Sequence, residues 1–222
     1  IIPRHWNDVN TATIAFGHGL AVTSLQASMG IAALVNGGKL IRPTFVKGTP
    51  PGSRTIRDNV VTPSTGEALR FLMRLNAEIG SARKADVPGY FMGGKTGTAE
   101  KVVNGRYAKD RVLTSFMGIL PAHAPRYLFL VMLDEPKGLP ETHGFRTSGW
   151  NAVPVAGDII KRIMPIIGVA PSVVPPTDPF PTISKLHAFG SERFAIEAQT
   201  RWPVSAETSL ERFLQSERGP RH

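Results

Sequence analysis

The 222-residue sequence predicts an α/β (α+β) domain built from an antiparallel sheet with flanking helices. Three observations support this class. Two helix-capping signals precede apolar residues at helical spacing before residue 80, three β-type segments follow one another between residues 90 and 133, and a further amphipathic segment comes after them. Strands joined by short turns pair antiparallel, and the helices must bury their apolar faces against the resulting sheet.

The helices expected before residue 80 each have a recognisable start. Thr23-Ser24-Leu25-Gln26 has the spacing of a capping box and begins a helix that runs to Val35. Thr62-Pro63 supplies a cap and a first helical residue for a second helix that runs to Ile79. Between these helices we expect short strands at residues 39–42 and 44–47 and a loop at residues 48–59. The inner face of the second helix should carry Leu69, Leu72, Met73 and Ile79, and its outer face Arg70, Arg74 and Glu78.

The β-type segments cover residues 90–98, 112–120 and 126–133. Asn104-Gly105 lies between the first two and is the strongest short hairpin signal in the chain. A last helix is expected from about residue 151 to residue 164, with Pro165 ending it. The sheet should therefore be a three-stranded antiparallel meander with this helix packed on one face.

The composition changes after Val169 and suggests two parts, residues 1–170 and residues 171–222. Five prolines between residues 171 and 181 predict an extended linker. The remaining residues are mostly polar, with one amphipathic candidate at residues 205–215. We expect a flexible tail there, and a docking segment is the alternative.

The formal net charge of +9 lies in the first part, because residues 1–170 hold 20 basic and 11 acidic side chains. These basic residues are scattered and are not clustered among aromatic ones, which argues against nucleic-acid binding. The excess charge favours a mild preference for anionic partners, such as carboxylated cell-wall polymers or a lipid surface.

Several other classes of site are disfavoured. The absence of cysteine excludes disulfides, cysteine-ligated metals and a cysteine nucleophile. The six histidines show no metal-binding spacing, so neither a metal nor a cofactor is expected. No apolar run reaches the roughly 18 residues of a transmembrane helix. Because the first residue is Ile1, we expect the chain to be processed or to be a piece of a longer protein.

The chemistry concentrates at Gly93-Gly94-Lys95-Thr96-Gly97-Thr98-Ala99, where two motifs compete for one lysine. Lys-Thr-Gly is the third motif of penicillin-recognising serine enzymes, and in them it lies on a strand at the edge of the active site. The stretch from Gly89 to Thr96 also fits the G-x-x-x-x-G-K-[ST] pattern of a P-loop, which would make the protein a nucleotide hydrolase. A P-loop needs a helix that begins at the lysine, whereas a hairpin is predicted after Lys95. The context therefore favours the first motif.

The sequence around this motif resembles the class B penicillin-binding proteins, the transpeptidases of peptidoglycan synthesis, and most of all their septal, cell-division type. The resemblance covers about residues 8–168. It is carried by the stretch from Gly94 to Ala99 together with residues 16–26, 31–43, 80–82, 87–90, 149 and 154–155. It implies the C-terminal half of the serine β-lactamase/transpeptidase fold.

The resemblance also implies roles for individual residues. Lys95 and the hydroxyls of Thr96 and Thr98 would hold the terminal carboxylate of D-Ala-D-Ala or of a β-lactam. The glycine of the motif, Gly97, leaves room for the substrate backbone, and the backbone N–H of Thr98 would donate to the tetrahedral intermediate. Trp150 would line the cleft, and core packing is the alternative for this residue.

Two motifs of the family are missing from this sequence. No serine is followed two places later by asparagine, and only Ser81-Ala82-Arg83-Lys84 fits Ser-x-x-Lys. We interpret that fit as accidental, because Ser81 follows Gly80 in a polar loop instead of beginning a buried helix. The nucleophilic serine is therefore expected to be absent, and the chain to be inactive alone.

The resemblance implies D,D-transpeptidation by the intact parent at the periplasmic face of the bacterial inner membrane. The implied partners are peptidoglycan stem peptides, β-lactams and division proteins, with membrane contact only through a missing N-terminal anchor. A third hypothesis stays open, in which the chain is a non-catalytic interaction module of cell division that acts through its basic surface or its tail.

Overall fold

The sheet predicted from the sequence is present in the computed structural model, which describes residues 5–15, 17, 19–48, 50–103, 106–172, 174, 176–177 and 180. Strands β3 (Gly93–Val103), β4 (Arg106–Leu120) and β5 (Tyr127–Asp134) form an antiparallel sheet in the order β3-β4-β5. The α/β (α+β) class is thereby confirmed. Asn104-Gly105 lies outside the described residues, but β3 and β4 pair up to Val103 and Arg106 on either side of it.

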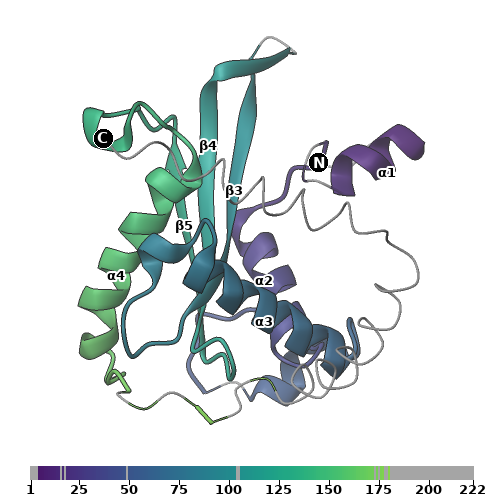
Figure 1. Cartoon of the computed structure of the whole chain (residues 1–222). Coiled ribbons are helices and arrows are strands. Elements are labelled where there is room, and N and C mark those ends of the chain that lie inside the picture. The colour runs from purple at the N-terminus through teal and green to yellow at the C-terminus, as the bar shows by residue number, and fades with distance from the viewer. Residues whose placement is uncertain are drawn as a thin grey trace, which may run out of the picture. The chain divides into compact units, whose positions relative to one another are not determined.

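Strand β4 is longer than expected because the β3–β4 hairpin continues past the part of the sheet that the helices cover (Figure 1). Residues 106–111 are mostly polar, so no strand was predicted there from the sequence. Residues 106–108 nevertheless pair with residues 101–103, and the register shifts between Glu100 and Lys101 where the hairpin leaves the sheet. A hairpin ladder needs backbone hydrogen bonds and does not need an apolar side.

The predicted helix starts are confirmed. In α2 (Ser24–Val35) the Thr23 hydroxyl accepts from Gln26 N at 3.2 Å, and Thr23 N donates to Gln26 Oε1 at 3.0 Å. In α3 (Pro63–Ile79) the Thr62 hydroxyl accepts from Thr65 N at 3.2 Å. Helix α4 (Ala152–Ile166) ends two residues later than predicted, so Pro165 lies inside its last turn.

Two elements differ from the prediction. Helix α1 (Asp8–Ala15) was not predicted from the sequence. None of its residues is buried, so the helix has no core-facing side to mark it, and its start rests on local hydrogen bonds between Asn7 and Asn10. The strand expected at residues 44–47 is absent, since Thr44 forms a local turn by accepting from Val46 N. Strand β1 (Leu40–Ile41) pairs instead with β2 (Thr55–Arg57), which lies in the segment expected to be a loop.

The main core lies between the sheet, α4 and the loop that follows α3. Its largest fully buried side chains are Phe116, Met92, Leu120, Ile160 and Val153. Gly94 belongs to this packing, because a Cβ at that position would lie 2.3 Å from Phe116 Cζ. The faces of α3 differ from the prediction: Leu72 and Ile79 are exposed, whereas Arg70 and Arg74 are partly buried and hydrogen-bonded.

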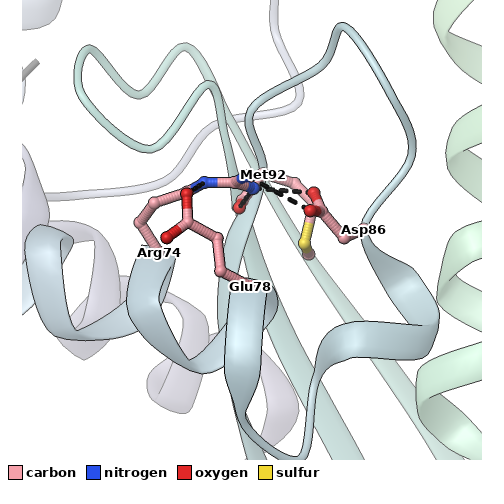
Figure 2. A network of polar contacts seen from close by, with 4 residues as sticks. All are labelled: Arg74, Glu78, Asp86 and Met92. Carbon is pink, nitrogen blue, oxygen red and sulfur yellow. Dashed lines mark hydrogen bonds and ion pairs between the residues drawn. The ribbon is translucent and has the colours of Figure 1, made fainter.

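Arg74 fixes the loop between α3 and β3 (Figure 2). Its guanidinium donates to Asp86 at 2.6 and 3.2 Å, to Glu78 at 2.9 Å and to the carbonyl oxygen of Met92 at 2.8 Å. Burial works against the charged form, but the hydrogen bond and charge of Asp86, with Glu78, outweigh it and raise the pKa of Arg74. One side chain thus joins helix α3 to both ends of the segment that leads into β3.

The compact unit runs from Ile1 to Phe180, whereas the sequence suggested a boundary after residue 170. The segment after α4 returns to the body, with Ser172 N donating to Gly89 O at 2.9 Å. Phe180 is 6% exposed and packs edge-on against Phe71, with ring centroids 5.6 Å apart. These contacts extend the unit beyond the predicted linker start, and the expected tail from Pro181 onward, including residues 205–215, lies outside the described residues.

Candidate active site

The Lys-Thr-Gly motif lies in strand β3, which is one of the two edge strands of the described sheet. Lys95 pairs with Met117 and Gly97 with Ser115 across the β3–β4 ladder. No helix begins at Lys95, and the residues from Gly89 to Met92 form no strand. The P-loop reading is therefore wrong, because phosphate binding at that motif depends on the N-terminal amides of a helix.

The strand separates the lysine from the two threonines. Thr96 and Thr98 line a cavity of about 340 Å³, together with residues of the loop after α3 and of the segment before α4. Lys95 lies on the opposite face and lines a second, almost wholly apolar cavity of about 370 Å³ between β3, α2 and α3. Its ammonium group donates to the carbonyl oxygen of Thr96 at 2.8 Å. Successive side chains on a strand point to opposite faces, so this division follows from the backbone.

The cavity beside the threonines is polar. Its lining residues are Ile79, Gly80, Ser81, Arg83, Lys84, Thr96, Thr98, Thr147, Ser148, Gly149 and Trp150. Five of them carry hydroxyls, two carry cations, and none carries a carboxylate. Hydroxyl donors and positive charges without a competing anion make up a site suited to an anionic ligand.

The Thr96 hydroxyl has a partner in the loop after α3. Ser81 Oγ lies 3.0 Å from Thr96 Oγ1, and either hydroxyl can donate. Asn76 Oδ1 accepts from both Ser81 N at 3.0 Å and Ser81 Oγ at 3.2 Å, while Asn76 Nδ2 donates to Gly94 O at 2.8 Å. Asn76 thus holds Ser81 against the strand that carries Thr96.

The Ser-x-x-Lys match at Ser81 does not form a nucleophile and base pair in this structure. The Ser81 hydroxyl is engaged by Asn76 and Thr96, whereas the Lys84 ammonium lies over the Trp150 ring, 3.4 Å from its centroid. A serine nucleophile needs its base within hydrogen-bond reach. This arrangement supports the interpretation that the match is accidental.

The Thr98 hydroxyl is oriented from the other side of the cavity. Ser148 N donates to Thr98 Oγ1 at 3.1 Å, and Ser148 Oγ donates to Ser115 O at 2.7 Å. Ser148 is buried, so both of these bonds are shielded from water. Because Thr98 Oγ1 accepts the backbone N–H, its own hydrogen is left to donate elsewhere, which suits a hydroxyl that binds an anion.

Asn151 holds the segment that carries Ser148 and Trp150. Its side chain accepts from Thr114 Oγ1 at 2.8 Å and donates to Arg146 O at 2.9 Å. Trp150 itself is half-buried and lines the cavity, so the prediction that it lies at the cleft is the correct one of the two alternatives.

Gly97 is constrained by its neighbour on β4 as well as by any ligand. A Cβ at Gly97 would lie 2.6 Å from Ser115 Oγ, which is too close for a side chain to be accommodated without movement. Ser115 also supplies the carbonyl that holds Ser148. Ser81, Ser148 and Ser115 were not predicted as supporting residues, because each reaches the motif from another segment of the chain.

No three His, Asp or Glu side chains among the described residues gather as a metal site would require. No helix in the described part of the chain has the length and apolar character needed to cross a bilayer. Lys101 bonds to Glu135 and Asp134, and these bonds raise the pKa of its ammonium group, but all three lie where the hairpin leaves the sheet.

Comparison with known proteins agrees with the motif. The family described as "Penicillin binding protein transpeptidase domain" matches residues 1–161. A probable peptidoglycan D,D-transpeptidase FtsI of Caulobacter vibrioides is 41% identical over 76% of this chain and 30% of its own length. Stage V sporulation protein D of Bacillus subtilis is 35% identical over 73% of this chain and 26% of its own length.

Solved structures give the same answer for the fold. The transpeptidase domain of penicillin-binding protein 3 from Burkholderia pseudomallei superposes with a TM-score of 0.65 at 30% identity, over 78% of this chain and 50% of that one. Penicillin-binding protein 3 of Mycobacterium tuberculosis, solved with ampicillin, gives 0.65 at 28% identity over 81% and 42%. The chain spans less than a third of these curated relatives and at most half of these solved chains. It belongs to the penicillin-binding protein transpeptidase domain family.

Proposed function

We propose that this chain supplies the Lys-Thr-Gly side of a peptidoglycan D,D-transpeptidase active site. The observation that carries the proposal is the position of the Thr96 and Thr98 hydroxyls, which line one cavity on an edge strand and are each held by a serine. These hydroxyls bind the terminal carboxylate of a D-Ala-D-Ala peptide or of a β-lactam. Lys95 contributes positive charge at the same strand from its other face.

The edge position of β3 gives the strand a further role in this proposal. Alternate backbone N–H groups of an edge strand have no partner strand on their outer side. The N–H of Thr98 donates to the oxyanion that forms on the substrate carbonyl, and a donor of this kind contributes about 3–4 kcal/mol to the transition state.

In the reaction, a serine hydroxyl attacks the penultimate D-Ala carbonyl and the peptide C–N bond breaks, so that the terminal D-Ala leaves with a proton on its nitrogen. An amine of a neighbouring peptide then attacks the acyl-enzyme, releases the serine and forms the new amide bond. The serine belongs to a Ser-x-x-Lys motif outside this sequence, so the chain alone forms no acyl-enzyme. The working site is the periplasmic face of the bacterial inner membrane.

The experiment is a pair of measurements. Titration of the chain with N-acetyl-D-Ala-D-Ala, followed by NMR, should shift the resonances of Thr96 and Thr98. Thr98→Val removes one hydroxyl and should weaken binding about tenfold, the effect of losing a hydrogen bond to a charged group. Thr55→Val makes the same change on β2, away from the cavity, and should leave the affinity unchanged.

Fluorescent penicillin tests the missing nucleophile. We expect no covalent label on this chain and strong labelling of a longer chain that adds the upstream Ser-x-x-Lys motif, much reduced by Lys95→Ala. A covalent label on the present chain would show that its nucleophile has been overlooked.

Contact with cell-division proteins is part of the same proposal. A pull-down that survives Lys95→Ala but is lost when residues 182–217 are removed would assign those contacts to the tail. Loss of the pull-down with Lys95→Ala alone would assign them to the strand that carries the Lys-Thr-Gly motif.

A further inference from the structure

Two loops orient the threonine hydroxyls at the cavity. Ser81 Oγ, in the loop after α3, lies 3.0 Å from Thr96 Oγ1. The backbone N–H of Ser148, in the segment before α4, donates to Thr98 Oγ1 at 3.1 Å. A threonine on a strand has more than one staggered rotamer, so the strand alone does not fix where each hydroxyl points. The relative placement of the two loops therefore decides whether both hydroxyls face one ligand.

The two loops lie against each other at Gly149. A Cβ at this position would lie 3.2 Å from the carbonyl oxygen of Ser81, which is closer than most side-chain contacts allow. The glycine thus permits a close approach of the two backbones. It has no side chain that could hold the loops together, so another contact is needed to keep them at this separation.

A lysine and a tryptophan make that contact. Lys84 lies in the single helical turn Arg83–Ala85 of the first loop, and Trp150 is the last residue of the helical turn Ser148–Trp150 of the second. The Lys84 ammonium lies 3.4 Å from the centroid of the Trp150 ring, within the range of a cation–π interaction. Because Ser148 begins the turn that Trp150 ends, a contact that holds the ring also holds the backbone N–H of Ser148.

Both partners of this contact are arranged to make it. Phe145 stacks on Trp150 with ring centroids 5.4 Å apart and an interplanar angle of 17°, so the tryptophan ring has a defined orientation. Asp86, two positions after Lys84, bonds to Arg74 instead (Figure 2). Among the described residues no carboxylate forms an ion pair with Lys84, so no anion competes with the ring for its ammonium group.

We propose that Lys84 and Trp150 are positioning residues that clasp the two loops together, so that the hydroxyls of Thr96 and Thr98 face the same ligand. Lys84 acts through the Trp150 ring and not through its own charge on the ligand. This inference rests on the proposed function and deepens it, because it names what sets the geometry of the carboxylate site. One cation–π contact at a partly exposed position is strong enough to change the equilibrium between clasped and open loops about threefold.

Hydrogen exchange of the Ser148 amide, followed by NMR, tests the clasp without a ligand. Lys84→Met keeps the length of the side chain and removes its charge, so this amide should exchange about threefold faster. Lys84→Arg keeps a cation above the ring and should restore the wild-type rate. Lys39→Met removes an exposed charge outside the cavity and should leave the rate unchanged, so it controls for net charge. Equal rates in the wild type and in Lys84→Met would overturn the clasp.

Titration with N-acetyl-D-Ala-D-Ala tests the effect of the clasp on the site. Lys84→Met should weaken binding about threefold, and Lys84→Arg should restore the affinity. A contact that only stabilised the fold would leave the affinity of the folded chain unchanged. In a Trp150→Leu background, which keeps an apolar side chain at this half-buried position, Lys84→Met should have no further effect. A threefold loss that persists in this background and shrinks at high salt would overturn the proposal, because it would assign Lys84 to a direct charge contact with the ligand.

The two measurements separate this inference from the function on which it rests. If the wild-type chain did not bind the dipeptide, the proposed function would be rejected, and the exchange rate of the Ser148 amide would still decide whether the clasp exists. If the wild-type chain bound it and lost affinity with Thr98→Val but not with Lys84→Met, the carboxylate site would stand and the positioning role of Lys84 would be overturned.

Discussion

Replacing Arg74 by alanine removes the hydrogen bonds by which its side chain joins helix α3 to the loop between α3 and β3. The largest part of the loss is the two-oxygen contact with Asp86. The side chains of Arg74 and Asp86 are 16% and 28% exposed, so this pair is partly shielded from water. We assign it about 2 kcal/mol, because charge-assisted hydrogen bonds of this kind contribute about 1.5–3 kcal/mol.

The other contacts of Arg74 add less. The bond to Met92 O loses about 1 kcal/mol when its donor is removed. Glu78 is 48% exposed and lies one helical turn away, so its pair with Arg74 contributes only about 0.4 kcal/mol. Arg74→Ala should therefore lower the free energy of unfolding by about 3–4 kcal/mol.

The assay is urea-induced unfolding followed by circular dichroism, arranged as a double-mutant cycle with Asp86→Ala. A coupling energy of about 2 kcal/mol is expected between the two positions. Arg74→Lys keeps the charge but loses the planar fork, and it should recover less than half of the loss. If the two alanine substitutions were additive to within about 0.4 kcal/mol, the ion pair would not hold this loop and the reasoning would be refuted.

Three further predictions concern the core, the C-terminal contact and pH, and each is checked by unfolding of the chain. Gly94→Ala should lower the free energy of unfolding by about 1–3 kcal/mol, because the new Cβ would meet the ring of Phe116. Gly30→Ala, at an open position of α2, should raise it by about 0.5–1 kcal/mol. A change of the same sign for both variants would contradict the packing argument. Phe180→Ala should cost about 3 kcal/mol and the matched change at exposed Phe45 less than about 0.5 kcal/mol, and similar costs would show that Phe180 is not a core residue. Burial, with a nearby arginine charge, lowers the pKa of His123, so the imidazole binds a proton more readily in the unfolded chain than in the folded one. The free energy of unfolding should therefore fall as the pH drops below about 6.5. His123→Gln should flatten this dependence of stability on pH, and an unchanged dependence would assign it to other groups.

Local signals in the sequence predicted local structure well. The capping box at Thr23 and the cap at Thr62 form as expected, since their hydrogen bonds join residues three positions apart. The strand that carries Lys95 was also predicted, from small and β-branched residues leading to a hairpin. The family followed from the motif in combination with its neighbouring segments, and the comparisons confirm it.

The division of the motif between two faces follows from the sequence once the strand is recognised. A strand has a side-chain period of two, so Lys95 is expected on one face and Thr96 and Thr98 on the other. The structure places the threonines on one face and the lysine on the other. The β1–β2 pairing and the hairpin part of β4 were missed, because neither carries an apolar pattern that the sequence reveals.

What the sequence determined by itself is the set of short-range features: the caps, the strand order of the meander, and the Lys-Thr-Gly motif with its family. Only the tertiary structure decided which groups surround that motif. Ser148 reaches Thr98 across 50 positions of the chain, Ser81 reaches Thr96 across 15, and Phe180 packs on a ring more than a hundred positions away. Such contacts depend on how the loops close over the sheet, and no periodicity or propensity along the chain records that closure.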